Sequence, residues 1–210
     1  LLTTMQTLTM EEIQLDALRE VGNIGAGHAM TSLATMLDKR VDMFVPRVGV
    51  IGLNEFVNLA GGAENCSAGI YMRVDGDAPG HIAFLMPYHS ACQLVDSLLG
   101  YPDGTITELD EMGASAIMEV GNILASSYQN ALSEMTGLDM LSSPPALAVD
   151  MTASILSAIA SAFIDIQESI LTIVTQIDGY LGSLEGYFIY IPEPGSLNSI
   201  LNALGLECTL

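Results

Sequence analysis

Two stripes of polar and small residues recur in this chain with the same spacing. Their members stand at intervals of four, three and four residues: Asp16, Glu20, Asn23 and Gly27 in the first stripe, and Ser115, Glu119, Asn122 and Ser126 in the second. In an α-helix these intervals place all members of a stripe on one face. Each stripe then presents a carboxylate, a carboxamide one turn later, and a small residue that leaves room for another molecule to dock against the helix.

A glutamate and an asparagine on one helix face are common, so a single pair would indicate only a solvated surface. Two features favour a function here. The pair recurs at matching positions although the residues around it differ, and both pairs lie in segments that contain glycine. Glycine costs a helix about 1 kcal/mol relative to alanine. The close approach of another backbone is the usual reason for glycines such as Gly22, Gly25 and Gly27.

The stripes belong to an internal duplication. The segment EVGNI occurs at Glu20–Ile24 and again 99 residues later at Glu119–Ile123, and Pro46 and Pro145 each follow the asparagine by 23 residues. Further echoes are YMRVDG (71–76) with IVTQIDG (173–179), GHIAFLMP (80–87) with GYFIYIP (186–192), and DSLLG (96–100) with NALG (202–205). A repeat of this kind indicates two similar structural units. We expect one domain over residues 1–210, with copies at about 10–100 and 107–205 and a linker at 101–106.

The local patterns predict the same order of elements in both copies. They indicate helices over residues 10–38, 89–99, 107–135, 152–160 and 196–204, and strands over 41–51, 65–74, 80–87, 163–176 and 186–191. Pro46 indicates an edge or irregular strand over 41–51, and residues 138–149 are expected to be extended but broken by Pro144 and Pro145. The predicted fold is α+β: two helix–strand–hairpin–helix repeats related by a pseudo-twofold axis. They would share one mostly antiparallel sheet with the long helices packed on it, which hides strand edges.

Composition and charge exclude several classes of function. Half of the 210 residues are apolar, and no apolar run reaches the roughly 20 residues of a membrane span. The net charge is −20, and every charged side chain after residue 100 is Asp or Glu. Nucleic-acid binding is therefore not expected, because phosphate contacts need a basic surface. The acidity fits a salt-adapted protein, a surface that attracts a basic partner, or both. Three scattered cysteines and no secretory signal predict a cytoplasmic protein with reduced thiols.

Other signals are weak. Gly25-Ala26-Gly27 lacks the preceding strand and the third glycine of a dinucleotide-binding loop. The three histidines, His28, His81 and His89, lack the spacing of metal ligands, so we expect them in ordinary packing or on the surface. The twelve methionines fit core filling better than an adaptable binding surface. The sequence therefore predicts no cofactor or metal bound by this chain.

The motif Asp/Ser-x3-Glu-x2-Asn, followed some twenty residues later by Pro, resembles the signature of the CheC/CheX/FliY family of response-regulator phosphatases. Both copies contain the motif, ending at Pro46 and Pro145, and Gly22-Asn23-Ile24-Gly25-Ala26-Gly27 is similar to the first helix of that family. The two-copy layout and the length extend the resemblance over essentially the whole chain. Two intact motifs without an additional domain point to the CheC branch, a group of chemotaxis phosphatases.

The resemblance implies a mechanism. The substrate would be a phosphorylated CheY-type receiver, which carries an acyl phosphate on an aspartate, a bound Mg²⁺ and an active-site lysine. Asn23 and Asn122 would orient the attacking water, because a carboxamide accepts a hydrogen bond without being ionised. Glu20 and Glu119 would pair with the receiver's lysine. Asp16, Gly27, Ser115 and Ser126 would support the docking face.

Two further functions remain open from the sequence. The first is a binding module, since proteins similar to CheC also bind and regulate CheD, a receptor deamidase. The second is a component of a motor switch that binds receivers without catalysis. The intact Glu and Asn in both copies favour a phosphatase over the second of these, but they do not separate a phosphatase from a CheD regulator.

Overall fold

A seven-stranded antiparallel sheet forms the centre of the computed structural model, which describes residues 12–161, 169–179 and 182–206. The strands run in the order β1-β6-β7-β3-β2-β4, and β5 also pairs with β2. Their bounds are Val41–Gly52 for β1, Cys66–Gly76 for β2, Gly80–Pro87 for β3, Met140–Ser142 for β4, Ala146–Met151 for β5, Ser169–Gly179 for β6 and Gly182–Pro192 for β7.

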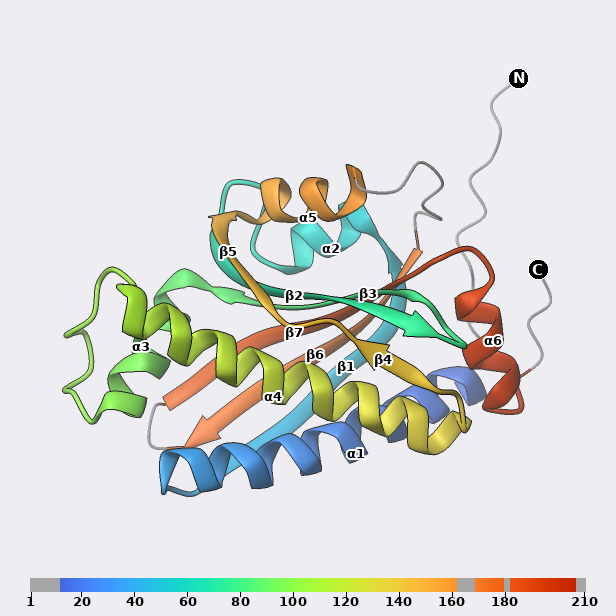
Figure 1. Ribbon diagram of the computed structural model, residues 1–210, viewed down its shortest axis with the longest axis horizontal. Helices are drawn as coiled ribbons and strands as arrows, with labels where there is room; N and C mark the ends of the chain where they lie inside the picture. The colour runs from blue at the N-terminus through green and yellow to red at the C-terminus, as the bar shows by residue number, and fades with distance from the viewer. Residues whose placement is uncertain (1–11, 162–168, 180–181, 207–210) are drawn as a thin grey trace.

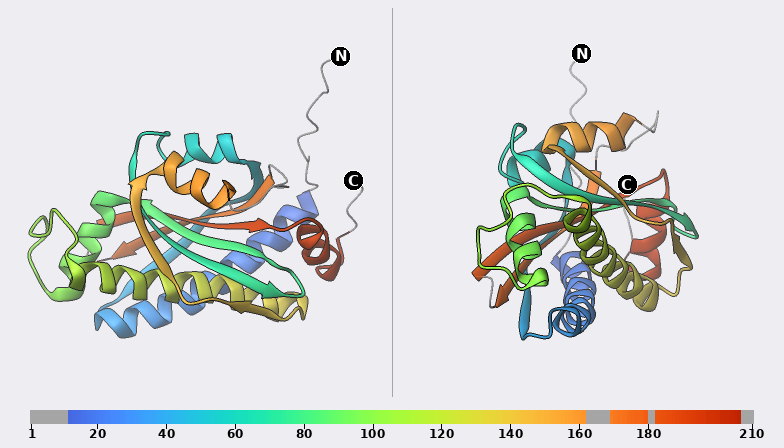
Figure 2. Two further views of the ribbon diagram at one scale, coloured as in Figure 1. Left: turned by 45° about the horizontal axis from the view of Figure 1, so that its top comes forward. Right: turned by 60° about the vertical axis from the view of Figure 1, so that its left-hand side comes forward.

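Helices cover both faces of the sheet and its two ends (Figure 1). The two long helices, α1 and α4, lie side by side on one face, and α2 and α5 lie on the other, as the turned views confirm (Figure 2). The remaining helices, α3 and α6, lie at opposite ends. The bounds are Glu12–Leu37 for α1, Leu53–Leu59 for α2, Tyr88–Leu99 for α3, Glu111–Thr136 for α4, Thr152–Ser161 for α5 and Ser196–Ala203 for α6. The predicted α+β class, with long helices packed on an antiparallel sheet, is confirmed.

The two copies exchange strands within the sheet. The strand β1 of the first copy pairs with β6 of the second, from Val41 opposite Gly179 to Gly52 opposite Ser169. In return, β4 and β5 of the second copy pair with β2 of the first. The hairpin strands β3 and β7 meet in the middle. Each hairpin is therefore flanked by a strand from the other copy, so neither copy builds its part of the sheet alone.

The core lies on both faces of the sheet because successive side chains of a strand point to opposite faces. In β3, Phe84 belongs to the cluster between the sheet and the long helices, whereas Leu85 belongs to the cluster under α2 and α5. The first cluster includes Tyr128 and Phe188, whose ring centroids are 4.9 Å apart. Strands buried on both sides read as continuous apolar runs, which is why residues 80–87 show no alternation.

Most predicted boundaries agree with the structure. Gly100 and Gly137 end α3 and α4 in the left-handed conformation, each with φ of 71°, as glycines after a helix commonly do. The start of α4 was predicted four residues too early. The helix begins after Asp110, whose carboxylate accepts a hydrogen bond from the Gly113 backbone N–H at 2.8 Å. The predicted start of α1 at residue 10 lies outside the described residues, and so do residues 163–168.

The linker between the copies is tied to α3 by a buried carboxylate. Asp96 accepts hydrogen bonds from the backbone N–H groups of Thr105 and Ile106, at 3.0 and 2.9 Å. Its carboxylate thereby satisfies two donors that would otherwise lack partners in a turn. None of the helices in the described part of the chain combines the length and apolar character that crossing a bilayer requires.

Candidate active site

The glycine of each EVGN segment faces the sheet. A Cβ atom on Gly121 would lie 2.3 Å from Cγ1 of Ile70 in β2, and one on Gly22 would lie 3.0 Å from a methyl carbon of Val45 in β1. At Gly121 only glycine lets the helix approach this closely, whereas at Gly22 the Val45 side chain would have to shift by a few tenths of an ångström. Because successive residues of an α-helix are about 100° apart, this contact turns the next residue, Asn23 or Asn122, towards the outer surface.

The two long helices cross at another glycine. A Cβ atom on Gly25 would lie 2.4 Å from Cδ1 and 3.0 Å from the backbone Cα of Tyr128. Tyr128 is fully buried, and its hydroxyl group lies 2.6 Å from the Thr175 hydroxyl group in β6. The close backbone approach predicted from the helix glycines is therefore confirmed at Gly25. At Gly22 the neighbours are side chains, and at Gly27 a Cβ atom would meet nothing within 4 Å.

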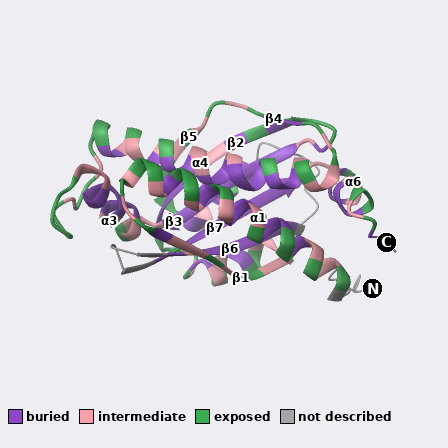
Figure 3. Cartoon of the chain, turned by 90° about the horizontal axis from the view of Figure 1, so that it is seen from below, coloured by how far each residue is buried: buried purple, intermediate pink, exposed green. Residues whose placement is uncertain are grey.

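The first-copy site consists of Asp16, Glu20, Asn23 and Gly27 on α1. The side chains of Glu20 and Asn23 are exposed on the outer surface of the helix, the surface that Figure 3 views from below. Asp16 forms an ion pair with Arg19, in which Nη1 donates to Oδ1 at 2.5 Å. Gly27 leaves open space at the end of the stripe. The predicted stripe is thus a solvent-facing surface with one ion pair at its start.

The second-copy site consists of Ser115, Glu119, Asn122 and Ser126 on α4. Ser115 and Glu119 are exposed, whereas Asn122 and Ser126 are half-buried. The Ser126 hydroxyl group donates to Oδ1 of Asn122 at 3.5 Å, a long contact. Each set of four side chains lies on one helix, and the two helices pack side by side, so the sites share one face of the molecule.

Both prolines of the motif lie at the edges of the sheet. Pro46 falls where the register of β1 shifts between Phe44 and Arg47, and Pro145 stands between β4 and β5. Proline lacks the N–H group that a central strand needs, which explains both places. The prediction of an edge or irregular strand around Pro46 is confirmed.

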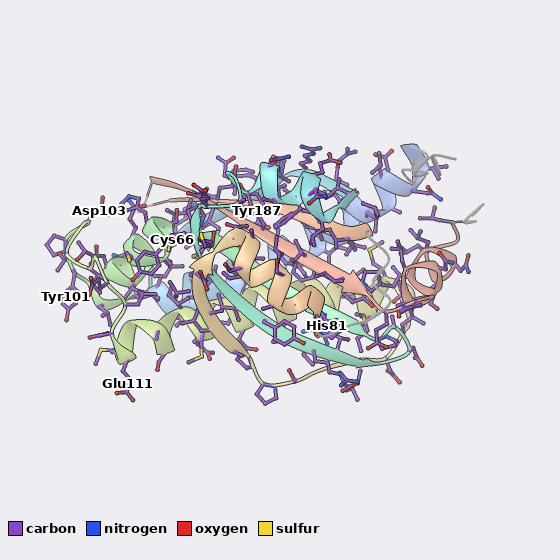
Figure 4. All side chains as sticks on the ribbon, turned by 90° about the horizontal axis from the view of Figure 1, so that it is seen from above. Cys66, His81, Tyr101, Asp103, Glu111 and Tyr187 are labelled. Carbon is purple, nitrogen blue, oxygen red and sulfur yellow. The ribbon has the colours of Figure 1, made fainter. Side chains whose placement is uncertain are left out.

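Two strongly perturbed titratable groups, His81 and Tyr187, lie on the hairpins, away from the stripes. Figure 4 shows His81 and Tyr187 on the face covered by α2 and α5. Burial lowers the pKa of His81 to about 4, assisted by the positive charge of Arg73. Its Nδ1 lies 2.8 Å from the Tyr71 hydroxyl group. Burial also raises the pKa of Tyr187, and a hydrogen bond to Glu185 adds to this effect. In the GHIAFLMP and GYFIYIP echoes, these residues hold the same position.

Within the described residues, no cluster of three or more His, Cys, Asp or Glu side chains could hold a metal ion. The functional groups that the two stripes present are a carboxylate and a carboxamide. Sequence reasoning overlooked Arg19. Its spacing of three residues from Asp16, which suits a helix ion pair, was the signal that could have found it.

Comparison with known proteins places both motifs in one family. The model of the CheC-like family matches residues 13–50 and 112–149, which contain the two segments from the first stripe residue to the proline. Across the whole chain, the sequence is 36% identical over 200 residues to the CheY-P phosphatase CheC of Bacillus subtilis. The match covers 93% of this chain and 96% of that protein. The chain belongs to the CheC-like family.

FliY proteins and a domain of FliM are also similar to this CheC-like chain. It is 26% identical over 137 residues to the flagellar motor switch phosphatase FliY of Bacillus subtilis, which covers 65% of this chain and 35% of FliY. The crystal structure of Thermotoga maritima FliY superposes with a TM-score of 0.77 over 94% of this chain and 98% of that one, at 18% identity. The middle domain of Helicobacter pylori FliM superposes with a TM-score of 0.68 over 92% of this chain and 99% of that domain, at 15% identity. At these identities the two structures establish the shared fold.

Proposed function

We propose that this chain is a phosphatase of phosphorylated CheY-type receivers, with Asn23 and Asn122 holding the attacking water in two sites. The observation that carries the proposal is the repeated Glu–Asn pair, which reaches solvent from a long helix in both copies. The glycine contacts beneath each pair fix the helix against the sheet. The name of the Bacillus subtilis relative, CheY-P phosphatase CheC, supports the same activity.

The reaction is hydrolysis of an acyl phosphate. The water oxygen forms a bond to phosphorus, the bond between phosphorus and the aspartyl oxygen breaks, and the products are inorganic phosphate and an aspartate carboxylate. Both protons of the water end on the phosphate, which is released as H2PO4⁻ and then equilibrates with the solvent. Phosphoryl transfer of this kind depends on positioning and charge stabilisation. Catalysis therefore requires of this chain an oriented water and a fixed docking geometry, while Mg²⁺ and the lysine belong to the receiver.

Each residue of the stripe has a role in this proposal. The carboxamide of Asn23 or Asn122 accepts a hydrogen bond from the water and holds its oxygen in line with the bond that breaks. Glu20 or Glu119 forms a charge-assisted bond with the receiver's lysine and sets the register of docking. The remaining stripe residues, Asp16, Gly27, Ser115 and Ser126, support the docking face. No cofactor of this chain takes part.

A contact with a CheD-type receptor deamidase remains a prediction, as does a cytoplasmic location. The second copy, whose charged side chains are all acidic, offers a surface that would attract a basic partner. Such a contact is compatible with phosphatase activity in the same protein.

Phosphate release from a Mg²⁺-loaded, phosphorylated CheY-type receiver tests the proposal. The wild type is expected to accelerate release, and the Asn23→Ala/Asn122→Ala double variant is expected to lose about tenfold or more of that acceleration, because the water is no longer held in place. Asn130→Ala is the matched control, since Asn130 is exposed on α4 beyond the stripe. It should retain the wild-type rate.

Binding of the phosphorylated receiver, measured in parallel, separates catalysis from recognition. The double variant should still bind, because Glu20 and Glu119 remain. If the wild type binds the receiver but leaves its rate of phosphate release unchanged, the chain is a phosphorylation-sensing adaptor and the phosphatase proposal fails.

A further inference from the structure

A positive charge stands beside the first-copy site and has no counterpart in the second. Arg19 lies four residues before Asn23, so the two side chains are neighbours on the outer face of α1. The residue 99 positions later, beside Asn122 in α4, is Met118. The Glu–Asn pair is thus identical in the two sites, while the residue next to it is a guanidinium in one and a thioether in the other.

The ion pair with Asp16 holds Arg19 on the docking surface. The Asp16 carboxylate accepts from Nη1, and the two side chains remain 62% and 53% exposed, respectively. An exposed pair of this kind contributes little to stability, so the fold does not explain the arginine. A guanidinium has five N–H donors in a planar fork, and Asp16 uses one nitrogen of that fork. The ion pair therefore holds the Arg19 guanidinium beside Asp16, at the start of the stripe.

Arg19 is one of few cations on a strongly acidic chain. At a net charge of −20, the molecule repels other anions at low ionic strength. The phosphorylation site of a receiver is itself anionic, because it carries a phosphoryl group among carboxylates. All five Lys and Arg residues lie in the first copy, and Arg19 is the one within a turn of a Glu–Asn pair. The second-copy site must meet the same anionic face without a cation from its own helix.

We propose that Arg19 is a specificity-determining residue that attracts the anionic phosphorylation site of the receiver to the first-copy site. The inference rests on the proposed phosphatase function and adds to it a residue that lowers KM in the first-copy site. Asp16 cancels the charge of Arg19 at long range, and the matching Ser115 and Met118 are neutral. The guanidinium therefore acts at short range on the docked receiver, and its contribution to KM shrinks as salt screens the charges.

Exchanging the two residues between the copies tests this proposal. In the Asn122→Ala background only the first-copy site keeps its asparagine, and adding Arg19→Met should lower kcat/KM about tenfold at low ionic strength. In the Asn23→Ala background only the second-copy site keeps its asparagine, and adding Met118→Arg should raise kcat/KM. Arg19→Lys should recover part of the loss, since it keeps the charge without the planar fork. The differences in kcat/KM between each background and its exchanged variant should become smaller as salt is raised from low to physiological concentration.

The anion that Arg19 contacts is identified by binding. Affinity is measured for the Mg²⁺-loaded receiver with and without beryllium trifluoride, a phosphoryl mimic. A loss in Arg19→Met confined to the mimic-bound receiver assigns the contact to the phosphoryl group, and an equal loss in both assigns it to receiver carboxylates. Unchanged affinity in both states, or unchanged kcat/KM in the Asn122→Ala background, overturns the proposal.

Failure of the two proposals is distinguishable. If neither the wild type nor the Asn122→Ala and Asn23→Ala proteins accelerate phosphate release, both the phosphatase proposal and the role of Arg19 are wrong. If these backgrounds are active and the exchanges leave kcat/KM unchanged, only the role of Arg19 is wrong. Thermal unfolding of each variant excludes a loss of fold, and Met118→Arg tests for a gain that no destabilisation could produce.

Discussion

Apart from its contact with α4, the helix of the first-copy site packs on the edge strand β1, whereas α4 spans several strands towards the other edge. The surroundings of the two asparagines follow from these places. Asn23 is exposed, with open space at Gly27, while Asn122 is half-buried with Ser126 beside it. The same motif thus lies in two environments. The Glu–Asn pair and its supporting glycine are identical in the two copies, whereas the flanking residues differ, so the two halves need not be equivalent in stability or activity.

Filling the space beneath the motif is expected to destabilise the protein. Gly121→Ala places a Cβ atom 2.3 Å from Ile70 Cγ1 and 2.7 Å from its Cβ, and such overpacking costs about 1–3 kcal/mol. The better helix propensity of alanine offsets about 1 kcal/mol of this. We expect a net loss of about 1–2 kcal/mol in the free energy of unfolding, measured by urea titration.

Two glycines of α1 are the controls for this substitution. Gly27→Ala meets open space, so it should gain up to about 1 kcal/mol from helix propensity. Gly22→Ala meets a Val45 methyl carbon at 3.0 Å and should fall between the two. If Gly121→Ala and Gly27→Ala unfold at the same urea concentration, the close packing of α4 on β2 is not a constraint.

The second prediction contrasts the pH dependence of the two hairpins. His81 stays neutral in the folded protein down to a pKa of about 4, whereas the unfolded chain takes up its proton near 6.5. The stabilising contribution of neutral His81 is therefore complete above pH 6.5 and is lost as pH falls towards 4. We expect the stability difference between the wild type and His81→Asn to shrink by about 2 kcal/mol over that range.

Tyr187 should show the opposite dependence. Its pKa is raised by burial and by Glu185, so above pH 10 the unfolded chain releases a proton that the folded protein retains. The advantage of the wild type over Tyr187→Phe should be complete below pH 10 and decline above it. Urea titrations from pH 4 to 11 measure both effects. A constant difference across either range would show that the hairpin residue titrates alike in both states.

The smallest effect concerns the orientation of Asn122. Removing the Ser126 hydroxyl group frees the carboxamide from a 3.5 Å contact, so it samples more rotamers and holds the water less well. In the Asn23→Ala background, Ser126→Gly should lower kcat for phosphate release about twofold. Gly27→Ser, in the Asn122→Ala background, supplies the missing hydroxyl group to the first-copy site. An increase in kcat after Ser126→Gly would mean that the serine competes with the water for Oδ1.

The sequence predicted local features well where a residue type dictates the backbone. Gly100 and Gly137 marked helix ends, and Pro46 marked an irregular edge strand. It failed where two signals compete. Thr107 and Asp110 are both suitable caps for α4, and the choice depends on tertiary contacts such as the hydrogen bond from the Leu109 N–H to the Tyr88 hydroxyl group. The spacing of the stripes located both candidate sites, but the difference between Asn23 and Asn122 depends on which strands lie beneath each helix.

The exchange of strands was beyond local reasoning. Alternation and turn residues indicate that residues 41–51 form a strand, but nothing within that segment specifies β6 as its neighbour. The partner is decided by burial across the whole sheet, because both hairpins have edges to cover. The break predicted at Pro144 and Pro145 is confirmed, because β4 ends before these prolines and β5 begins after them. Nothing within residues 138–149, however, specifies that both strands pair with β2.

The exchanged strand also has a consequence for synthesis. Val41 pairs with Gly179 and Gly52 with Ser169, so β1 leaves the ribosome long before its partner has been made. Contacts of such high sequence separation slow folding, and an unpaired strand that carries Phe44, 53% exposed even in the finished sheet, can associate with other nascent chains. β1 therefore remains without its partner strand while the second copy is synthesised, and we expect the nascent chain to need chaperones to avoid aggregation.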